Sequence, residues 1–201
     1  MRRLAIVLSS IAAVTAAAGD KDKPRFTSGP ASSYPGHQTL DKITIAAVPF
    51  TTPEQASSAF GKANPYKYGI LPVLVIIQND TGKALKLDLT AEYLDPANRH
   101  EDAIPPLNIV LWDGASNVSW KTGSGPPILP PLPGRKPKKG PLDVPEIEGL
   151  AFSAHLVPEG DSVRGFYYFE AQKLPGSRIY LTGIKDAATG KDYFYFEVPM
   201  E

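Results

Sequence analysis

The stretch Ile70-Leu71-Pro72-Val73-Leu74-Val75-Ile76-Ile77 decides the fold of this chain. It contains no charged residue and is rich in β-branched side chains, a pattern that predicts a strand buried on both faces. Pro72 has no backbone N–H to donate, so it is expected near the beginning of this strand or at a bulge. The core of the fold should therefore be built around residues 70–77.

The segments on either side of this run continue the β pattern. Residues 43–50 alternate in the manner of a first strand, and Asn79-Asp80-Thr81-Gly82 is a turn signal. In residues 85–93, apolar side chains at odd positions alternate with polar ones, which predicts a strand with one solvated face. Two strands joined by a short turn predict a hairpin between residues 70–77 and 85–93.

One short helix is expected between the first two strands. Thr52 is a suitable N-cap, Pro53 suits the first helical position, and Gln55 completes a capping box. Gly61 can end the helix in a left-handed conformation. A helix this short needs tertiary support to be stable.

The second half of the chain also predicts strands. Five segments have strand-like sequence: 109–112, 151–157, 163–169, 179–184 and 193–198. The last two predict a second hairpin. About seven strands with turns between them predict an all-β fold, an antiparallel sandwich.

The N-terminus has the composition of a secretory signal peptide. Arg2 and Arg3 precede an uncharged, mostly apolar run of 15 residues that closes on Ala16-Ala17-Ala18. A membrane-spanning helix needs roughly 20 such residues, so cleavage after Ala18 is expected and no transmembrane anchor should remain. We therefore divide the chain into a signal peptide (1–18), a flexible leader (19–41) and one domain (42–201), and expect the mature protein to be secreted or periplasmic.

Composition excludes several classes of function. The chain of 201 residues has no cysteine, which excludes thiol catalysis and cysteine-based metal sites. Its 21 basic and 21 acidic residues balance, and loss of Arg2 and Arg3 leaves a net charge of −2. Such a protein lacks the basic surface that nucleic-acid binding requires, so no nucleic-acid partner is expected.

Two segments resemble a known type of domain. Residues 68–79 (YGILPVLVIIQN) place an apolar strand before an Asn turn, and residues 156–166 (LVPEGDSVRGF) place a Pro-x-Gly turn before a late strand. Both resemble small exported bacterial immunoglobulin-like domains, over roughly residues 42 to 199. The resemblance implies an immunoglobulin-like antiparallel β-sandwich and brings no catalytic motif with it. The Cys-Trp-Cys signature of antibody-type domains is absent.

Aromatic residues offer one kind of candidate contact site. Trp112 and Trp120, with Tyr66 and Tyr68 near predicted loops as well, could stack on sugar rings, or could seal the ends of the core. In the aromatic runs 166–169 and 193–196, alternate members should face the core, and an aromatic outer face would be a candidate contact patch.

A proline-rich insertion is the other candidate. Residues 126–145 hold eight prolines in twenty positions, which favours extended polyproline structure. Pro130 and Pro133 belong to a P-x-x-P-x-[RK] pattern ending at Arg135. Together with Lys136, Lys138 and Lys139, Arg135 forms a basic cluster that could dock on an anionic envelope polymer or a partner protein. The alternative is an insertion that binds nothing.

No assembled catalytic chemistry is visible. The nucleophile elbow, the phosphate-binding loop and the H-E-x-x-H motif are missing, and His37, His100 and His155 are far apart in sequence. We therefore expect a non-catalytic exported structural or protein-interaction module of the cell envelope, with no cofactor. The alternatives are a carbohydrate-binding module that uses exposed aromatics and, third, a secreted hydrolase built from scattered acids.

Overall fold

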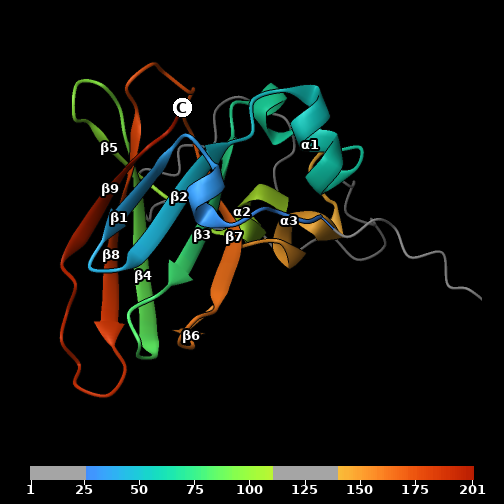
Figure 1. The fold of residues 1–201 in the computed structure, drawn as a ribbon. Coiled ribbons are helices and arrows are strands. Elements are labelled where there is room, and N and C mark those ends of the chain that lie inside the picture. The colour runs from blue at the N-terminus through green and yellow to red at the C-terminus, as the bar shows by residue number, and fades with distance from the viewer. Residues whose placement is uncertain (1–25, 111–139) are drawn as a thin grey trace, which may run out of the picture.

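The computed structural model describes residues 26–110 and 140–201, which form two antiparallel sheets packed face to face (Figure 1). Sheet A has the order β1 (His37–Leu40), β2 (Ile43–Pro49), β3 (Leu71–Asn79), β7 (Ser162–Phe169). Sheet B has the order β5 (His100–Asp102), β4 (Leu85–Leu94), β8 (Arg178–Asp186), β9 (Tyr195–Pro199), and β6 (Leu156–Val157) also pairs with β4. The prediction of an all-β protein with antiparallel sheets is confirmed, with more strands than expected.

Strand β3 lies inside sheet A and is buried on both faces, as predicted. Leu71, Val73, Val75 and Ile77 face sheet B and belong to the core between the sheets. Leu74 and Ile76 point the other way, into a second apolar cluster. Pro72 is the second residue of the strand, where its carbonyl accepts a hydrogen bond from the Phe50 N–H at 2.9 Å.

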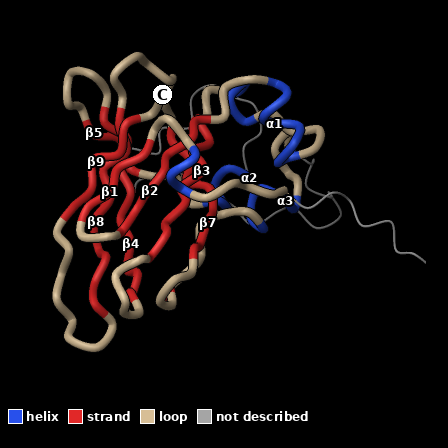
Figure 2. The backbone as a smooth tube through the Cα atoms, in the orientation of Figure 1, coloured by secondary structure: helices blue, strands red, loops and turns tan. Residues whose placement is uncertain are grey.

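The second cluster lies between sheet A and a layer of helices. These are α1 (Pro53–Phe60), α2 (Pro106–Val110), α3 (Pro145–Gly149) and two 3₁₀ turns, η1 (Ala31–Ser33) and η2 (Pro65–Tyr68). Figure 2 shows α1, α2 and α3 on the same side of the strands. Their buried members include Phe60, Ile109 and Ile147. The molecule thus has three layers with a core in each gap.

Helix α1 forms as its sequence predicts. The Thr52 hydroxyl accepts a hydrogen bond from the Gln55 N–H at 3.3 Å, and the Gln55 side-chain oxygen accepts one from the Thr52 N–H at 3.1 Å. This capping box satisfies N–H groups that the first turn leaves free. Ala56, Ala59 and Phe60 then face the second core, which supplies the tertiary support that a short helix needs.

The predicted hairpin between residues 70–77 and 85–93 is wrong. β3 pairs with β2 and β7, whereas β4 pairs with β5, β6 and β8, so the turn after Asn79 carries the chain from one sheet to the other. Asn79 is fully buried, and its amide nitrogen lies within hydrogen-bond distance of the carbonyls of Lys83, Val157 and Pro158. These contacts hold the turn that links β3 of sheet A to β4 of sheet B.

Two smaller expectations also differ from the structure. Residues 109 and 110 lie in helix α2 and are not in a strand, because Pro106 begins a helical turn that directs Ile109 into the second core. Within residues 151–157, only Leu156–Val157 forms a strand, and Ala151 makes an isolated parallel bridge to Phe166. The predicted second hairpin is confirmed, since β8 and β9 pair from Arg178 opposite Pro199 to Thr182 opposite Tyr195.

The fold begins earlier than the expected domain boundary at residue 42. Residues 37–40, which the sequence assigns to the flexible leader, form β1 and pair with β2. Phe26 packs on Phe50 and Phe166 with ring centroids 5.8 and 5.6 Å away. An aromatic anchor and a strand therefore tie residues 26–41 to sheet A. Across the described residues, we find no helix long and apolar enough to cross a membrane.

Candidate functional site

The contact residues that the sequence singles out cannot be placed. The structure describes nothing between residues 111 and 139, and that segment holds all of them: Trp112, Trp120, Pro130, Pro133, Arg135, Lys136, Lys138 and Lys139. Tyr66 and Tyr68, which the sequence groups with the tryptophans, lie in η2 and pack partly buried against the two cores. These two tyrosines seal the core and do not form an open platform.

The outer face of sheet B carries a different group of aromatic and charged side chains. Alternation along the strands sends Tyr93, Ile179, Leu181 and Phe196 into the core between the sheets. Their neighbours therefore project outward, and cross-strand pairing sets them side by side. We call this group the aromatic–acidic patch; it consists of Glu92, Asn98, His100, Arg178, Tyr180, Phe194, Tyr195 and Glu197.

Three rings form a continuous track across the patch. Tyr180 on β8 stacks on Tyr195 of β9, with ring centroids 5.4 Å apart and planes at 27°. His100 on β5 meets Tyr180 edge-on at 6.0 Å and 67°. Tyr195 is 52% exposed although Tyr180 stacks against it, so much of its ring is open to solvent. The track thus ends in an accessible aromatic surface.

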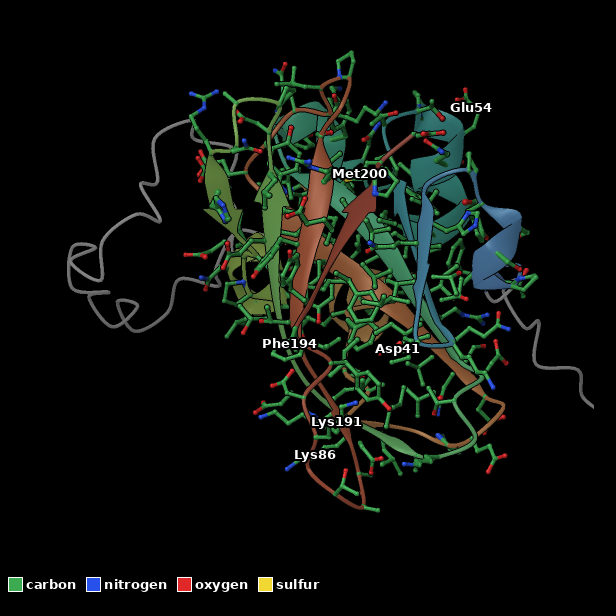
Figure 3. The ribbon with its side chains drawn as sticks, turned by 60° about the vertical axis from the view of Figure 1, so that its left-hand side comes forward. Asp41, Glu54, Lys86, Lys191, Phe194 and Met200 are labelled. Carbon is green, nitrogen blue, oxygen red and sulfur yellow. The ribbon has the colours of Figure 1, made fainter. Side chains whose placement is uncertain are left out.

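Phe194 extends the patch at the beginning of β9. Its side chain is 78% exposed, and its backbone has φ of 62°, a left-handed conformation that bulky residues rarely adopt. The carboxylate of Asp192 accepts a hydrogen bond from the Phe194 N–H at 2.8 Å and helps to hold this conformation. Figure 3 marks Phe194 just before β9 and Met200 just after it. Phe194 therefore leaves most of its ring in contact with solvent, next to Tyr195 in the chain.

Charged and polar contacts lie on both sides of the aromatic track. The Glu92 carboxylate contacts Nδ1 of His100. Arg178 contacts Glu197 at 3.3 Å and donates to the side-chain oxygen of Asn98 at 2.5 Å. The Nε donor of Arg178 is buried, and within the described residues it has no hydrogen-bond partner. The patch thus presents carboxylate acceptors next to guanidinium and imidazole groups.

Part of the patch forms a shallow recess of about 580 Å³. It is lined by Glu92, Leu94, Asn98, His100, Arg178, Tyr180 and Glu197. Asp102 lies directly opposite Glu92 on β5 and adds a further carboxylate to this face. Three carboxylates therefore lie around the guanidinium of Arg178, so acidic groups outnumber this cation near the recess, whereas Lys86 and Lys185 lie opposite each other further along the same outer face. An acidic recess accepts neutral ligands and repels anionic ones.

A second hollow lies behind sheet A. It has a volume of about 770 Å³ between α1, α3 and β7, and Phe26, Ala59, Leu150 and Phe166 are among its apolar lining residues. Arg164 at its side is already bonded to the Ser28 hydroxyl at 3.1 Å. The lining of this hollow is mainly apolar, and its polar members are Arg164, Glu146 and three serines. We take the aromatic–acidic patch as the candidate site because it places stacked, exposed rings beside charged groups.

The histidines do not converge on a metal site. His37 on β1 bonds to the Tyr34 carbonyl, and His100 pairs with Glu92 on the patch. His155 precedes β6, where its carbonyl accepts from the Leu87 N–H. Among residues 26–110 and 140–201, no three His, Asp or Glu side chains lie close enough together to hold a metal ion.

Sequence reasoning finds only a small part of this patch. The alternation in residues 193–196 indicates that one set of aromatics faces outward, and Tyr195 does so. Tyr180 and the ion pairs are missed because they come from other strands, and only strand pairing brings them beside Tyr195. A comparison with protein-family models and a comparison with curated proteins both find no match for this chain.

Proposed function

We propose that this chain is a non-catalytic, exported binding module of the cell envelope, and that the aromatic–acidic patch is its contact surface. The proposal includes an immunoglobulin-like arrangement of the sandwich and a signal peptide cleaved after Ala18. It is supported by the apolar N-terminal run and by a β-framework whose outer face carries exposed rings.

One observation carries this proposal. Tyr195 is 52% exposed and continues the ring track through Tyr180 to His100, and its chain neighbour Phe194 is 78% exposed. Exposed aromatic groups lose solvent contact favourably when a partner covers them. A protein face that keeps exposed aromatic rings beside charged side chains is suited to binding a partner.

The arrangement of acids favours binding over catalysis. Glycosidases need two carboxyl groups free to act on a bond held between them. Glu92 and Glu197 both lie opposite Tyr180, one on each neighbouring strand, but Glu92 is engaged by His100 and Glu197 by Arg178. The recess is also open, so water is not excluded from it. Incubation of the purified protein with glycan, ester or peptide substrates is expected to leave them intact.

Cosedimentation with envelope fragments of the producing cell tests the contact surface. The mature protein should pellet with the fragments, and a Tyr180→Ala, Tyr195→Ala double variant should lose at least about tenfold in apparent affinity, as expected for aromatic hot spots. Leu107→Ala is the matched control, because Leu107 is 59% exposed on helix α2 behind sheet A. Equal retention of all three proteins, each folded by urea titration, would refute the patch as the contact surface.

Export is tested by the N-terminus of the protein recovered outside the cytoplasm. Cleavage after Ala18 leaves Gly19 as the first residue, and intact-mass measurement should find that species. A variant with Ala16→Lys and Ala18→Lys should accumulate unprocessed, because the peptidase requires small residues at these positions. Recovery of the full-length chain in the cytoplasm would contradict the export proposal.

A further inference from the structure

We propose that the ligand of the aromatic–acidic patch is a neutral, hydroxyl-rich glycan, an inference that rests on the binding function proposed above. It assigns the ligand class from the chemistry of the recess and the ring track. The site differs from the tryptophan platform expected from the sequence, because it is built from tyrosines on β8 and β9 and from groups on β4 and β5.

The polar groups of the recess match vicinal hydroxyls. Each sugar hydroxyl is at once a donor and an acceptor. The recess presents carboxylate acceptors on Glu92 and Glu197 and cationic donors on Arg178, with the Asn98 amide beside them. Adjacent hydroxyls of one pyranose ring could donate to a carboxylate and accept from the guanidinium that already pairs with it. Such charge-assisted hydrogen bonds are stronger than neutral ones.

The ring track supplies the apolar half of the interaction. A pyranose has one or both faces lined by C–H groups, which carry slight positive charge and are attracted to the negative face of an aromatic ring. Tyr180 stacks against Tyr195 and orients it, so the Tyr195 ring is held in place before a ligand arrives. A fixed ring loses little conformational entropy on binding, which favours affinity for a flexible polymer.

The charge around the recess favours neutral polymers over anionic ones as the ligand. Around the recess, Glu92, Asp102 and Glu197 outnumber Arg178, while Lys86 and Lys185 lie further along the same outer face. A uronic acid or phosphate group placed in the recess would therefore meet a net negative potential, and like-charge contacts suppress the wrong partner. The anionic polymer expected for the proline-rich segment depends on basic residues between positions 135 and 139, and none of those contributes to the patch as described.

Charge also separates a glycan from a protein partner. The centre of a protein interface is depleted of charged residues, because burial of an ion pair under a dry surface costs more free energy than the pair returns. The patch has charged groups at its centre, on both sides of Tyr180. A glycan keeps such groups hydrated through its own hydroxyls and through bridging water.

The test treats the envelope fragments of the cosedimentation experiment before the protein is added. Mild periodate oxidation, which cleaves vicinal diols, should abolish retention of the mature protein, whereas digestion of the fragments with a broad-specificity protease should leave it unchanged. The converse result, with retention lost after protease and kept after periodate, overturns the glycan and leaves the proposed binding function standing. Absence of retention on untreated fragments would instead count against the proposed function itself.

Affinity electrophoresis identifies the ligand class directly. Native gels cast with a neutral β-glucan, mannan, xylan or galactan are compared with gels containing polygalacturonate. At least one neutral polymer should retard the mature protein and polygalacturonate should not. Tyr195→Ala should weaken this retardation at least about tenfold, and Leu107→Ala should not change it. The proposal would be refuted if polygalacturonate alone retarded the protein. It would also be refuted if no neutral polymer retarded the protein and the envelope fragments still retained it after periodate oxidation.

Discussion

Asn79 ties three segments of the chain together and should be among the residues most sensitive to substitution. Its amide nitrogen lies 2.7 to 3.1 Å from three backbone carbonyls, and its side-chain oxygen accepts from the Thr81 N–H and hydroxyl. Asn79→Ala leaves several of these buried groups without partners, so the free energy of unfolding should fall by about 2–5 kcal/mol. Urea titration followed by circular dichroism measures the change.

Two variants show whether the hydrogen-bond donor of Asn79 is responsible. Asn79→Asp keeps the acceptor but replaces the donor by a negative oxygen facing the same carbonyls, and should be at least as destabilising as Asn79→Ala at neutral pH. Thr81→Ala removes a partly exposed hydroxyl that contacts the Asn79 side-chain oxygen and the carbonyl and N–H of Lys83, and it should cost only about 1 kcal/mol. A small, equal effect of all three substitutions would contradict this account.

Asp186 gives the stability a defined acid dependence. The backbone N–H of Thr189, with Lys83 and the N–H of Ala188, lowers the pKa of this carboxyl to about 2. A lowered pKa means that its stabilising contribution is complete above the unfolded value near 3.8 and is lost as the pH falls towards 2. Unfolding free energies measured by urea at pH 7, 5, 4 and 3 should therefore fall more steeply below pH 4 for the wild type than for Asp186→Asn.

Lys83→Met is the control for this pH dependence. Lys83 is 59% exposed and contacts Asp186 at 3.1 Å, but the largest cause of the lowered pKa is the Thr189 N–H. The variant should keep most of the acid dependence, because the backbone bonds remain. Loss of the whole dependence in Lys83→Met would show that the ion pair, and not the turn backbone, sets the pKa.

At the level of elements, the bulge between β4 and β8 depends on Gly183. Its φ is 89°, and a Cβ atom built there would lie 1.9 Å from the Asp88 carbonyl oxygen. Gly183→Ala should therefore destabilise the protein by about 2–5 kcal/mol, from backbone strain together with displacement of β4. Thermal unfolding followed by circular dichroism checks this value.

Gly190 provides a matched comparison in the β8–β9 turn. Its φ is 73°, but a Cβ atom added to it would meet no other atom within 4 Å. Gly190→Ala should cost only the strain of a left-handed residue, about 1–2 kcal/mol. Equal losses for the two alanine variants would mean that the close approach of Asp88 contributes nothing.

The elements that could be predicted are those whose signals are local. The burial of β3 and the cap of α1 depend on residues within one segment, and both predictions are confirmed. The predicted pairing of β3 with β4 is wrong because the turn after Asn79 needs Val157 and Pro158, which are distant in sequence. A turn sequence shows that the chain reverses, but it does not show which strand becomes the neighbour.

The candidate site depends even more on distant pairing. Tyr195 could be placed on an outer face from alternation alone, but its neighbour Tyr180 and the charged groups come from β8, β4 and β5. No spacing in the sequence brings these groups together. The tryptophans and the basic cluster of residues 135–139 lie outside the described residues, so those predictions stand untested.

At the scale of the whole molecule, residues 26–41 belong to the fold and should add to its stability. Phe26 is partly buried against Phe50 and Phe166, so Phe26→Ala should cost about 1–3 kcal/mol in urea unfolding. Leu40→Ala in the same segment is the control, since Leu40 is 43% exposed and its substitution should cost less than about 1 kcal/mol. If Phe26→Ala leaves stability unchanged, the segment is a loose tether.

The edges of the two sheets limit how copies of the protein can join. β1 and β9 lie against each other where the sheets meet, and the backbone near Gly36 approaches the Pro199 carbonyl closely. β7 is flanked by the bridge at Ala151, and β5 and β6 are only three and two residues long. A growing fibril needs a long, flat strand whose amide groups await a partner. Among the described residues, each sheet edge is therefore short, or is bridged or covered over part of its length, and this disfavours edge-to-edge pairing between copies of the protein.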